Sequence, residues 1–188
     1  MNRSTLFRKG LASLSLAVVL SPFALSADII DDLEDGNNQN ETGYYWYFYT
    51  DDADCGTSEV TNATKDDAGK PLMTPSASKG RGGGYAAECS WKFGANKPVG
   101  CSGKCEYGQM VGMGTMLAAE GKTTGEWSAA ATAIKFWAKA SAAMKITVEI
   151  ATSAVEDFGY HCKTVSVGTD WTEISIDLAD ISQPTWAV

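Results

Sequence analysis

A regular alternation of apolar and polar residues in the C-terminal half is the feature that most limits the fold. Ile134 and Phe136 alternate with Lys135 and Trp137, and the same period of two recurs in three later segments. The alternating segments are 133–140 (AIKFWAKA), 144–151 (MKITVEIA), 163–167 (KTVSV) and 172–178 (TEISIDL). A period of two is typical of antiparallel strands with one face in the core and the other in solvent.

The rest of the chain also favours an all-β fold. Short connections rich in Ala, Ser, Gly, Asp and Thr separate the alternating segments, as expected for turns. Upstream, residues 82–93 and 107–117 predict further strands, and residues 55–80 predict a polar surface excursion with one short strand near 59–62. The one helical candidate, near 123–132, is short. Strands at this spacing without alternating helices predict an antiparallel β-sandwich of the jelly-roll type.

The N-terminus has the pattern of a secretory signal peptide. Its first ten residues carry three basic side chains and no acid, and residues 11–25 are almost wholly apolar. That run matches a secretory h-region and is short for a bilayer span, and no second run of membrane length follows it. Small residues favour cleavage after Ser26 or Ala27. We interpret residues 1–27 as a signal peptide and 28–188 as one secreted domain, either extracellular or at the cell surface.

The acidic balance of the chain limits its partners. The formal net charge is −8, and removal of the basic leader makes the exported part more acidic. Such a balance repels phosphate backbones, so we exclude nucleic acid as a partner. The acid clusters at 28–35 and 51–54 could hold a hard cation such as calcium, although most clusters of Asp and Glu are only solvated.

All the cysteines lie in the exported part, where an oxidising compartment favours disulfides. They are Cys55, Cys89, Cys101, Cys105 and Cys162. An odd number cannot pair fully within one chain, so one thiol is left over and the pairing stays open. Cys101 and Cys105, in CSGKC, could close a small local loop. A metal site is disfavoured, because His161 is the one imidazole and no second paired-cysteine motif accompanies the first.

Six aromatic residues stand in a row in the stretch GYYWYFYTDD. In a strand, the three odd-numbered tyrosines point to one face and the other three rings to the opposite face. The set that contains Trp46 and Phe48 is the more apolar, so we assign it to the core. This assignment leaves Tyr45, Tyr47 and Tyr49 in line on the outer face, about 7 Å apart.

Such a row could bind sugar, because the apolar face of a pyranose ring stacks on an aromatic ring and a phenol adds a hydrogen-bonding hydroxyl. Nearby acids such as Asp51, Asp52 and Asp157 could accept hydrogen bonds from sugar hydroxyls. Trp137, between two lysines on the polar face of its strand, is a second candidate platform. The alternative is that a loop covers the tyrosines as part of the core.

No catalytic signature is present in the chain. A Ser-His-Asp or Cys-His device would have to use His161. A glycosidase needs two facing carboxylates, but with 23 acids some pair always looks suitable, so that signal carries no weight. Neither HExxH nor GxSxG occurs. The sequence therefore predicts a protein that is not itself an enzyme.

Four segments, in their order along the chain, resemble family 11 carbohydrate-binding modules and equally the wider set of galactose-binding-like jelly rolls. They are 29–36 (IIDDLEDG), 133–140 with its approach at 126–128, 146–167 and 170–184. The likeness covers most of the exported chain. It implies a non-catalytic β-jelly roll that binds β-glucan of the cellulose type in a cleft on one sheet and carries structural calcium. Such modules commonly accompany enzymes that degrade plant cell walls.

The resemblance also implies two sets of site residues. The calcium ligands that it assigns are Asp31, Asp32 and Glu34. The carbohydrate contacts that it assigns are an aromatic within 45–49 and a turn with Glu156, Asp157, Tyr160 and His161. Two further strands would follow in the family where this chain ends, so the resemblance predicts a C-terminally short domain. The open strand edge, or the odd cysteine, could then support self-association.

Three functions remain in competition at this point. The leading hypothesis is a secreted carbohydrate-binding module that stacks β-glucan on surface aromatics. The second is a structural or adhesion protein of the cell surface that uses the jelly roll for protein contacts, through its open edge and odd cysteine. The third is a fragment of a glycoside hydrolase such as a cellulase.

Overall fold

The computed structural model describes residues 29–54, 56–67, 69–94, 109–117, 131–152, 154–155 and 159–187. Several predictions from the sequence lie outside this part of the chain. They are the signal peptide at 1–27, most of the helical pattern near 123–132, the acids Glu156 and Asp157, and the thiols of Cys55, Cys101 and Cys105. These remain predictions.

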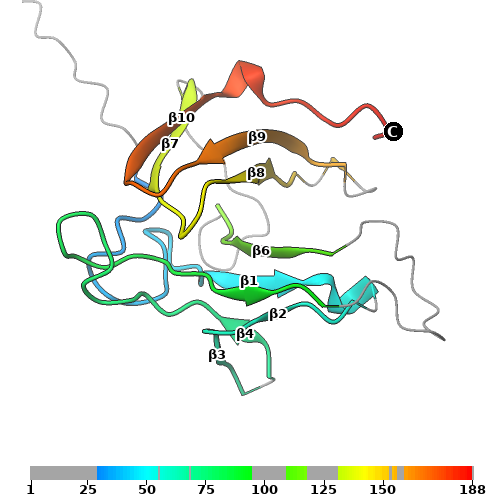
Figure 1. The fold of residues 1–188 in the computed structure, drawn as a ribbon. Helices are drawn as coiled ribbons and strands as arrows, with labels where there is room; N and C mark the ends of the chain where they lie inside the picture. Colours follow the sequence, from blue (N-terminus) through cyan, green and yellow to red (C-terminus); the bar gives the residue numbers. More distant parts are fainter. Residues whose placement is uncertain are drawn as a thin grey trace, which may run out of the picture.

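The described part of the chain is built from antiparallel strands, and its only helices are two short 3-10 turns. The strands are β1 (Tyr47–Thr50), β2 (Glu59–Val60), β3 (Thr64–Lys65), β4 (Pro71–Leu72), β5 (Trp91–Lys92), β6 (Val111–Gly114), β7 (Ala133–Ala138), β8 (Met144–Ile150), β9 (His161–Val167) and β10 (Thr172–Asp177). The 3-10 turns are η1 (Asp51–Asp54) and η2 (Leu178–Asp180). Figure 1 shows two layers, with β7, β8, β9 and β10 in one and β1, β2, β3, β4 and β6 in the other. The predicted all-β sandwich is confirmed.

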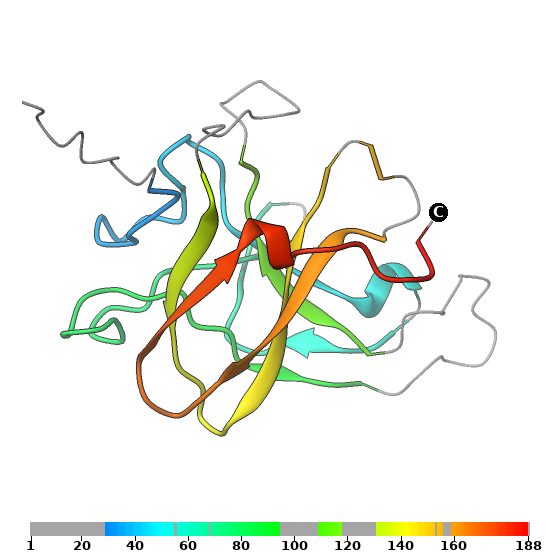
Figure 2. The same cartoon turned by 90° about the horizontal axis from the view of Figure 1, so that it is seen from above.

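The first layer is one long two-stranded ribbon with a bend in the middle. Strand β7 pairs with β10, and β8 pairs with β9, both antiparallel. Between the two ladders, the Ala140 N–H donates to the Gly168 carbonyl at 2.8 Å, so the pairing continues across the bend. Figure 2 shows the ribbon from above, with β7 beside β10 and β8 beside β9.

The alternating residues of the ribbon form its core, as the period of two predicts. Val167, Ile174 and Ile176 are buried, and partly buried apolar side chains from all four strands pack against them. These partners include Phe136, Ile146, Val148 and Val165. Burying each of the large aliphatic side chains stabilises the fold by about 1.5–3 kcal/mol. The apolar face of the ribbon is therefore what holds the first layer together.

The second layer is a four-stranded sheet in the order β3-β4-β1-β6, accompanied by the separate pair β2-β5. Its buried apolar residues are Phe48, Met73 and Ala86, which do not belong to the cluster in the ribbon. The sequence predicted the strand near 59–62 and the strand within 107–117, but it missed β3 and β4. Strands of two residues are too short to show a period.

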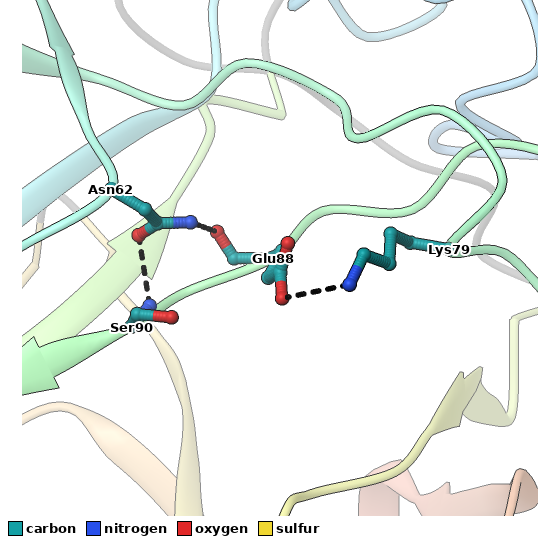
Figure 3. A network of polar contacts seen from close by, with 4 residues as sticks. All are labelled: Asn62, Lys79, Glu88 and Ser90. Carbon is teal, nitrogen blue, oxygen red and sulfur yellow. Dashed lines mark hydrogen bonds and ion pairs between the residues drawn. The ribbon is translucent and has the colours of Figure 1, made fainter.

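A small polar network joins the chain around β2 and β5 (Figure 3). The Asn62 amide donates to the Glu88 carbonyl at 2.8 Å and accepts the Ser90 N–H at 2.8 Å. The Glu88 carboxylate in turn forms an ion pair with Lys79 at 3.9 Å. Beyond the two register pairs, the Thr61 N–H still donates to the Ser90 carbonyl at 2.7 Å, and the Asn62 side chain takes the hydrogen bonds that no backbone partner makes there.

No helix in the described ranges is long and apolar enough to cross a membrane.

Candidate functional site

The tyrosines at positions 45, 47 and 49 form an exposed row, which we call the tyrosine face. Their exposed fractions are 55%, 42% and 37% respectively, whereas Phe48 between them is only 4% exposed. Trp46 is half-buried. Neighbouring side chains on a strand point to opposite faces, and this alternation explains both the burial of Phe48 and the exposure of the tyrosines.

Two glycines opposite the tyrosines let the rings lie close to the sheet. On β6, Gly114 is the register partner of Tyr47 and Gly112 is the partner of Tyr49. A Cβ atom at Gly112 would lie only 2.0 Å from the Tyr49 ring, and one at Gly114 would lie 3.3 Å from the Tyr47 hydroxyl. The rings of Tyr47 and Tyr49 have centroids 6.3 Å apart and are tilted by 48°. Glycine in place of a side chain therefore frees the space that the phenol rings occupy.

A buried asparagine fixes the turn that leads into the tyrosine face. The Asn40 amide nitrogen donates to the Thr115 hydroxyl at 3.0 Å and to the Met116 carbonyl at 2.8 Å. Its amide oxygen accepts the N–H groups of Thr42 and Tyr44, both at 3.0 Å. A buried amide with all these partners ties the start of the aromatic run to the end of β6.

A buried carboxylate fixes the other end of β1. Asp51 is 3% exposed and accepts the Ser58 N–H at 2.9 Å, the Ser58 hydroxyl at 2.7 Å and the Met110 N–H at 3.3 Å. Burial alone would raise the pKa of Asp51, but the hydrogen bonds from Ser58 and Met110 outweigh it and hold the pKa below its ordinary value. Asp51 is therefore an internal anchor, and it is not available to contact sugar as the sequence suggested.

A carboxylate from the first layer lies near the tyrosine face. Strands β8 and β9 lie over β1 and β6 in both views of the fold (Figures 1 and 2). Partial burial raises the pKa of the Tyr49 phenol, and the negative charge of Glu149 on β8 raises it further. Partial burial also raises the pKa of Glu149 itself. Glu149 was not singled out from the sequence, because only the tertiary fold brings it toward Tyr49.

The other predicted sugar contacts lie on the first layer. Trp137, on β7, is 42% exposed, and the Arg81 guanidinium lies 4.0 Å from the centre of its indole. Tyr160 and His161, at the start of β9, are half-buried, and the His161 Nδ1 atom is buried with no hydrogen-bond partner in the described part of the chain. The structure thus gathers the three tyrosines in one row and places the remaining described candidates on other strands.

The acidic opening segment forms turns with its own backbone. Asp31 accepts the Leu33 N–H at 2.6 Å and the Trp46 indole N–H at 2.5 Å, and Asp32 accepts the Glu34 N–H at 3.0 Å. Burial is the main cause that raises the pKa of Asp31. Among the residues that the structure describes, no three His, Cys, Asp or Glu side chains gather in a group able to hold a metal ion. Calcium also binds carbonyl and water oxygens, so calcium binding by Asp31, Asp32 and Glu34 stays a prediction.

The cysteines in the described ranges are not bridged. Cys89 and Cys162 are half-buried free thiols. Burial raises the pKa of the Cys89 thiol, which keeps it protonated and unreactive near neutral pH. The pairing of the other three thiols and self-association of the chain remain predictions.

Comparison with known proteins gives a distant similarity to a glucan-degrading enzyme. No family model matches the chain, and no solved structure matches it. The chain is 25% identical over 183 residues to endoglucanase 3 of Fibrobacter succinogenes (strain ATCC 19169 / S85). The match includes 92% of this chain but 25% of the endoglucanase, so the chain spans about a quarter of the length of that curated relative.

Proposed function

We propose that this chain is a secreted, non-catalytic carbohydrate-binding domain that holds a β-glucan chain against its tyrosine face. The observation that carries the proposal is the exposed row of Tyr45, Tyr47 and Tyr49, held between two buried polar anchors. Rings on a fixed strand can stack against successive sugar rings at little cost in conformational entropy, because the scaffold has already ordered them.

The chemistry of the row suits a neutral polysaccharide. Each phenol offers an apolar face for a pyranose ring and a hydroxyl for the hydrogen bonds at its edge. Glu149, when ionised, can accept hydrogen bonds from sugar hydroxyls close to Tyr49. Stacking supplies most of the affinity in this scheme, and the carboxylate favours one orientation of the sugar.

The similarity to an endoglucanase supports a role in glucan breakdown. A domain that covers a quarter of such an enzyme suits an accessory that keeps catalysis close to its polymer, and export follows from the extracellular location of such polymers. The same similarity is compatible with a fragment of a cellulase. Release of reducing sugar from β-glucan by the purified protein would favour the fragment and overturn the non-catalytic assignment.

Affinity electrophoresis against soluble β-glucan, together with retention on insoluble cellulose, tests the proposal. We expect the Tyr45→Ala/Tyr47→Ala/Tyr49→Ala variant to lose retention. A matched control removes another exposed aromatic pair, Trp91 and Phe93, whose ring centroids are also 6.3 Å apart. Unchanged retention in the triple variant would reject the tyrosine face, whatever the control shows.

Thermal unfolding with and without a calcium chelator tests the calcium prediction separately. If Asp31, Asp32 and Glu34 hold a structural calcium ion, the chelator lowers the thermal stability of the wild type and has a smaller effect on an Asp32→Asn/Glu34→Gln variant. An equal response of the two proteins would contradict a site at these residues.

A further inference from the structure

The outer face of the ribbon carries a second group of aromatic side chains, and this group is surrounded by positive charge. Five residues define what we call the tryptophan patch: Arg81, Lys135, Trp137, Lys139 and Trp171. The Arg81 guanidinium lies 4.0 Å from the centre of the Trp137 ring, and the Lys139 ammonium lies 5.0 Å from the centre of the Trp171 ring. Both distances are within the range of cation–π attraction.

The cations of the tryptophan patch form no ion pair with the described residues. In that part of the chain, the ion pairs within 4 Å join Lys79 to Glu88 and Lys163 to Asp180, so Arg81, Lys135 and Lys139 take no part in one. Two acids, Glu173 and Asp177, lie on the facing strand β10 as the register partners of Trp137 and Ala133. With three cations against these two acids, the patch keeps a small local excess of positive charge on a chain whose formal net charge is −8.

The loop that presents Arg81 is tied down on both sides. Within it, the Gly80 N–H donates to the Gly84 carbonyl at 2.8 Å, and Gly82 and Gly83 take positive φ angles of 82° and 94°, which glycine adopts without strain. The ion pair of Lys79 with Glu88 lies at the start of the loop (Figure 3). At its end, the Tyr85 ring lies so close to Gly36 that a Cβ there would meet it at 2.8 Å. Arg81 is therefore held toward Trp137 by the fold of the loop.

We propose that the tryptophan patch binds an acidic sugar, the uronic acid unit of an anionic polysaccharide. The part of the Trp137 indole that Arg81 leaves exposed offers a surface for the apolar face of the sugar ring. A guanidinium stacked on an aromatic ring uses its flat face for that contact and keeps its N–H edge for a bidentate bond to a carboxylate. The surrounding lysines add charge attraction.

Charge decides between an acidic and a neutral polymer. A neutral glucan laid over Trp137 would partly desolvate Arg81 and the lysines without giving them an anion, which costs free energy. A uronate supplies that anion. The remaining surface of the acidic chain repels polyanions, so any such binding must be local to the patch, and it must weaken as salt screens it. The tyrosine face is not needed for this inference.

Binding of polygalacturonate to the full chain at low ionic strength, measured by isothermal titration calorimetry, tests the inference. We expect wild-type binding that salt weakens, and no binding of a carboxyl-reduced form of the same polymer. Arg81→Gln is expected to lower the affinity about tenfold through the lost charge-assisted contact, and Trp137→Ala is expected to lower it about tenfold through the lost stacking surface. Lys65→Gln, on the exposed strand β3 of the other layer, changes the net charge equally and should alter the affinity less than about twofold.

Several results would overturn the inference. These are the absence of wild-type binding at low salt, equal binding of the carboxyl-reduced polymer, or equal losses in Arg81→Gln and Lys65→Gln. Sedimentation that shows a dimer abolished by Arg81→Gln, without polymer binding, would assign the patch to a second acidic copy of the chain instead. Circular dichroism of each variant confirms that a loss of affinity is not a loss of fold. Lys139→Gln removes a second cation of the patch and is compared with Lys65→Gln in the same way as Arg81→Gln.

Discussion

The tyrosine face and the tryptophan patch both expose aromatic rings, but they are supported in different ways. The tyrosines lie on a strand whose two ends are fixed by the buried side chains of Asn40 and Asp51. The tryptophan patch lies on the ribbon, whose apolar core is behind it, and its arginine comes from a glycine-rich loop held mainly at the surface. The first surface depends on buried polar groups and the second on exposed contacts. Mutations should therefore affect them with very different magnitudes.

The largest expected effect is on stability, at the anchor of the tyrosine face. In Asp51→Ala, the N–H groups of Ser58 and Met110 lose their buried acceptor, so we expect a loss of about 3 kcal/mol in the free energy of unfolding. Urea unfolding measures it. Lys79→Gln removes the exposed ion pair below the tryptophan patch and should cost less than about 1 kcal/mol.

Equal losses of unfolding free energy in Asp51→Ala and Lys79→Gln would contradict the difference in support between the two surfaces. An internal control is Asp52→Asn, which removes the exposed charge next to Asp51, keeps an oxygen that can accept from the Thr50 hydroxyl, and should change stability by less than about 0.5 kcal/mol.

The next effect is on sugar affinity, through the glycines of β6. Gly112→Ala places a Cβ where the Tyr49 ring lies, so the ring must move away from the sheet. We expect the affinity for β-glucan to fall about tenfold, which corresponds to about 1.4 kcal/mol. Gly114→Ala is the matched control: its Cβ would lie 3.3 Å from the Tyr47 hydroxyl, which needs only a slight shift.

Binding of polygalacturonate should not change in either glycine variant, because the tryptophan patch is formed by β7, Trp171 and the loop of Arg81, and none of these contains Gly112 or Gly114. Should Gly112→Ala weaken both ligands equally, the two surfaces would not be independent sites.

Acid should weaken the anchor of the tyrosine face. Because hydrogen bonds hold the folded-state pKa of Asp51 below the ordinary value of 3.8, its contribution to stability is complete above pH 3.8. That contribution is lost as the pH falls through the lowered folded-state pKa. Urea unfolding of the wild type at pH 5 and at successively lower values should show this decline. In Asp51→Asn, which cannot ionise, the decline should be shallower, and an equal slope in both proteins would contradict the role of this carboxylate.

The sequence predicted the ribbon well because its apolar side chains alternate over four long segments, and that alternation places Val167, Ile174 and Ile176 in one core. The same reasoning correctly separated Phe48 from the exposed tyrosines. It was wrong to assign Asp51 to sugar binding. The burial of this carboxylate depends partly on Met110, which is 59 residues away in the sequence, and no local pattern shows that contact.

The supporting glycines and charges were missed for related reasons. Gly112 and Gly114 do alternate in the sequence, in phase with a strand, and this spacing could have indicated rings lying across a neighbouring strand. Nothing local could have linked Arg81 to Trp137, because the loop and β7 are joined only by the tertiary fold. Patterns of period two predict which face a residue lies on, and they do not predict its neighbours from other strands.

The smallest effect concerns the charge next to the tyrosine face. The Glu149 carboxylate helps to raise the pKa of the Tyr49 phenol, so Glu149→Gln should lower that pKa toward its ordinary value of 10.0. Ultraviolet difference titration of the tyrosines measures the shift, and subtraction of a Tyr49→Phe titration assigns it to this residue. Glu173→Gln provides the matched control, because it removes the acid beside Trp137 instead, and it should leave the Tyr49 titration unchanged. A shift of the same size in both variants would mean that Tyr49 responds only to the overall charge, and Glu149 would then no longer belong to the tyrosine face.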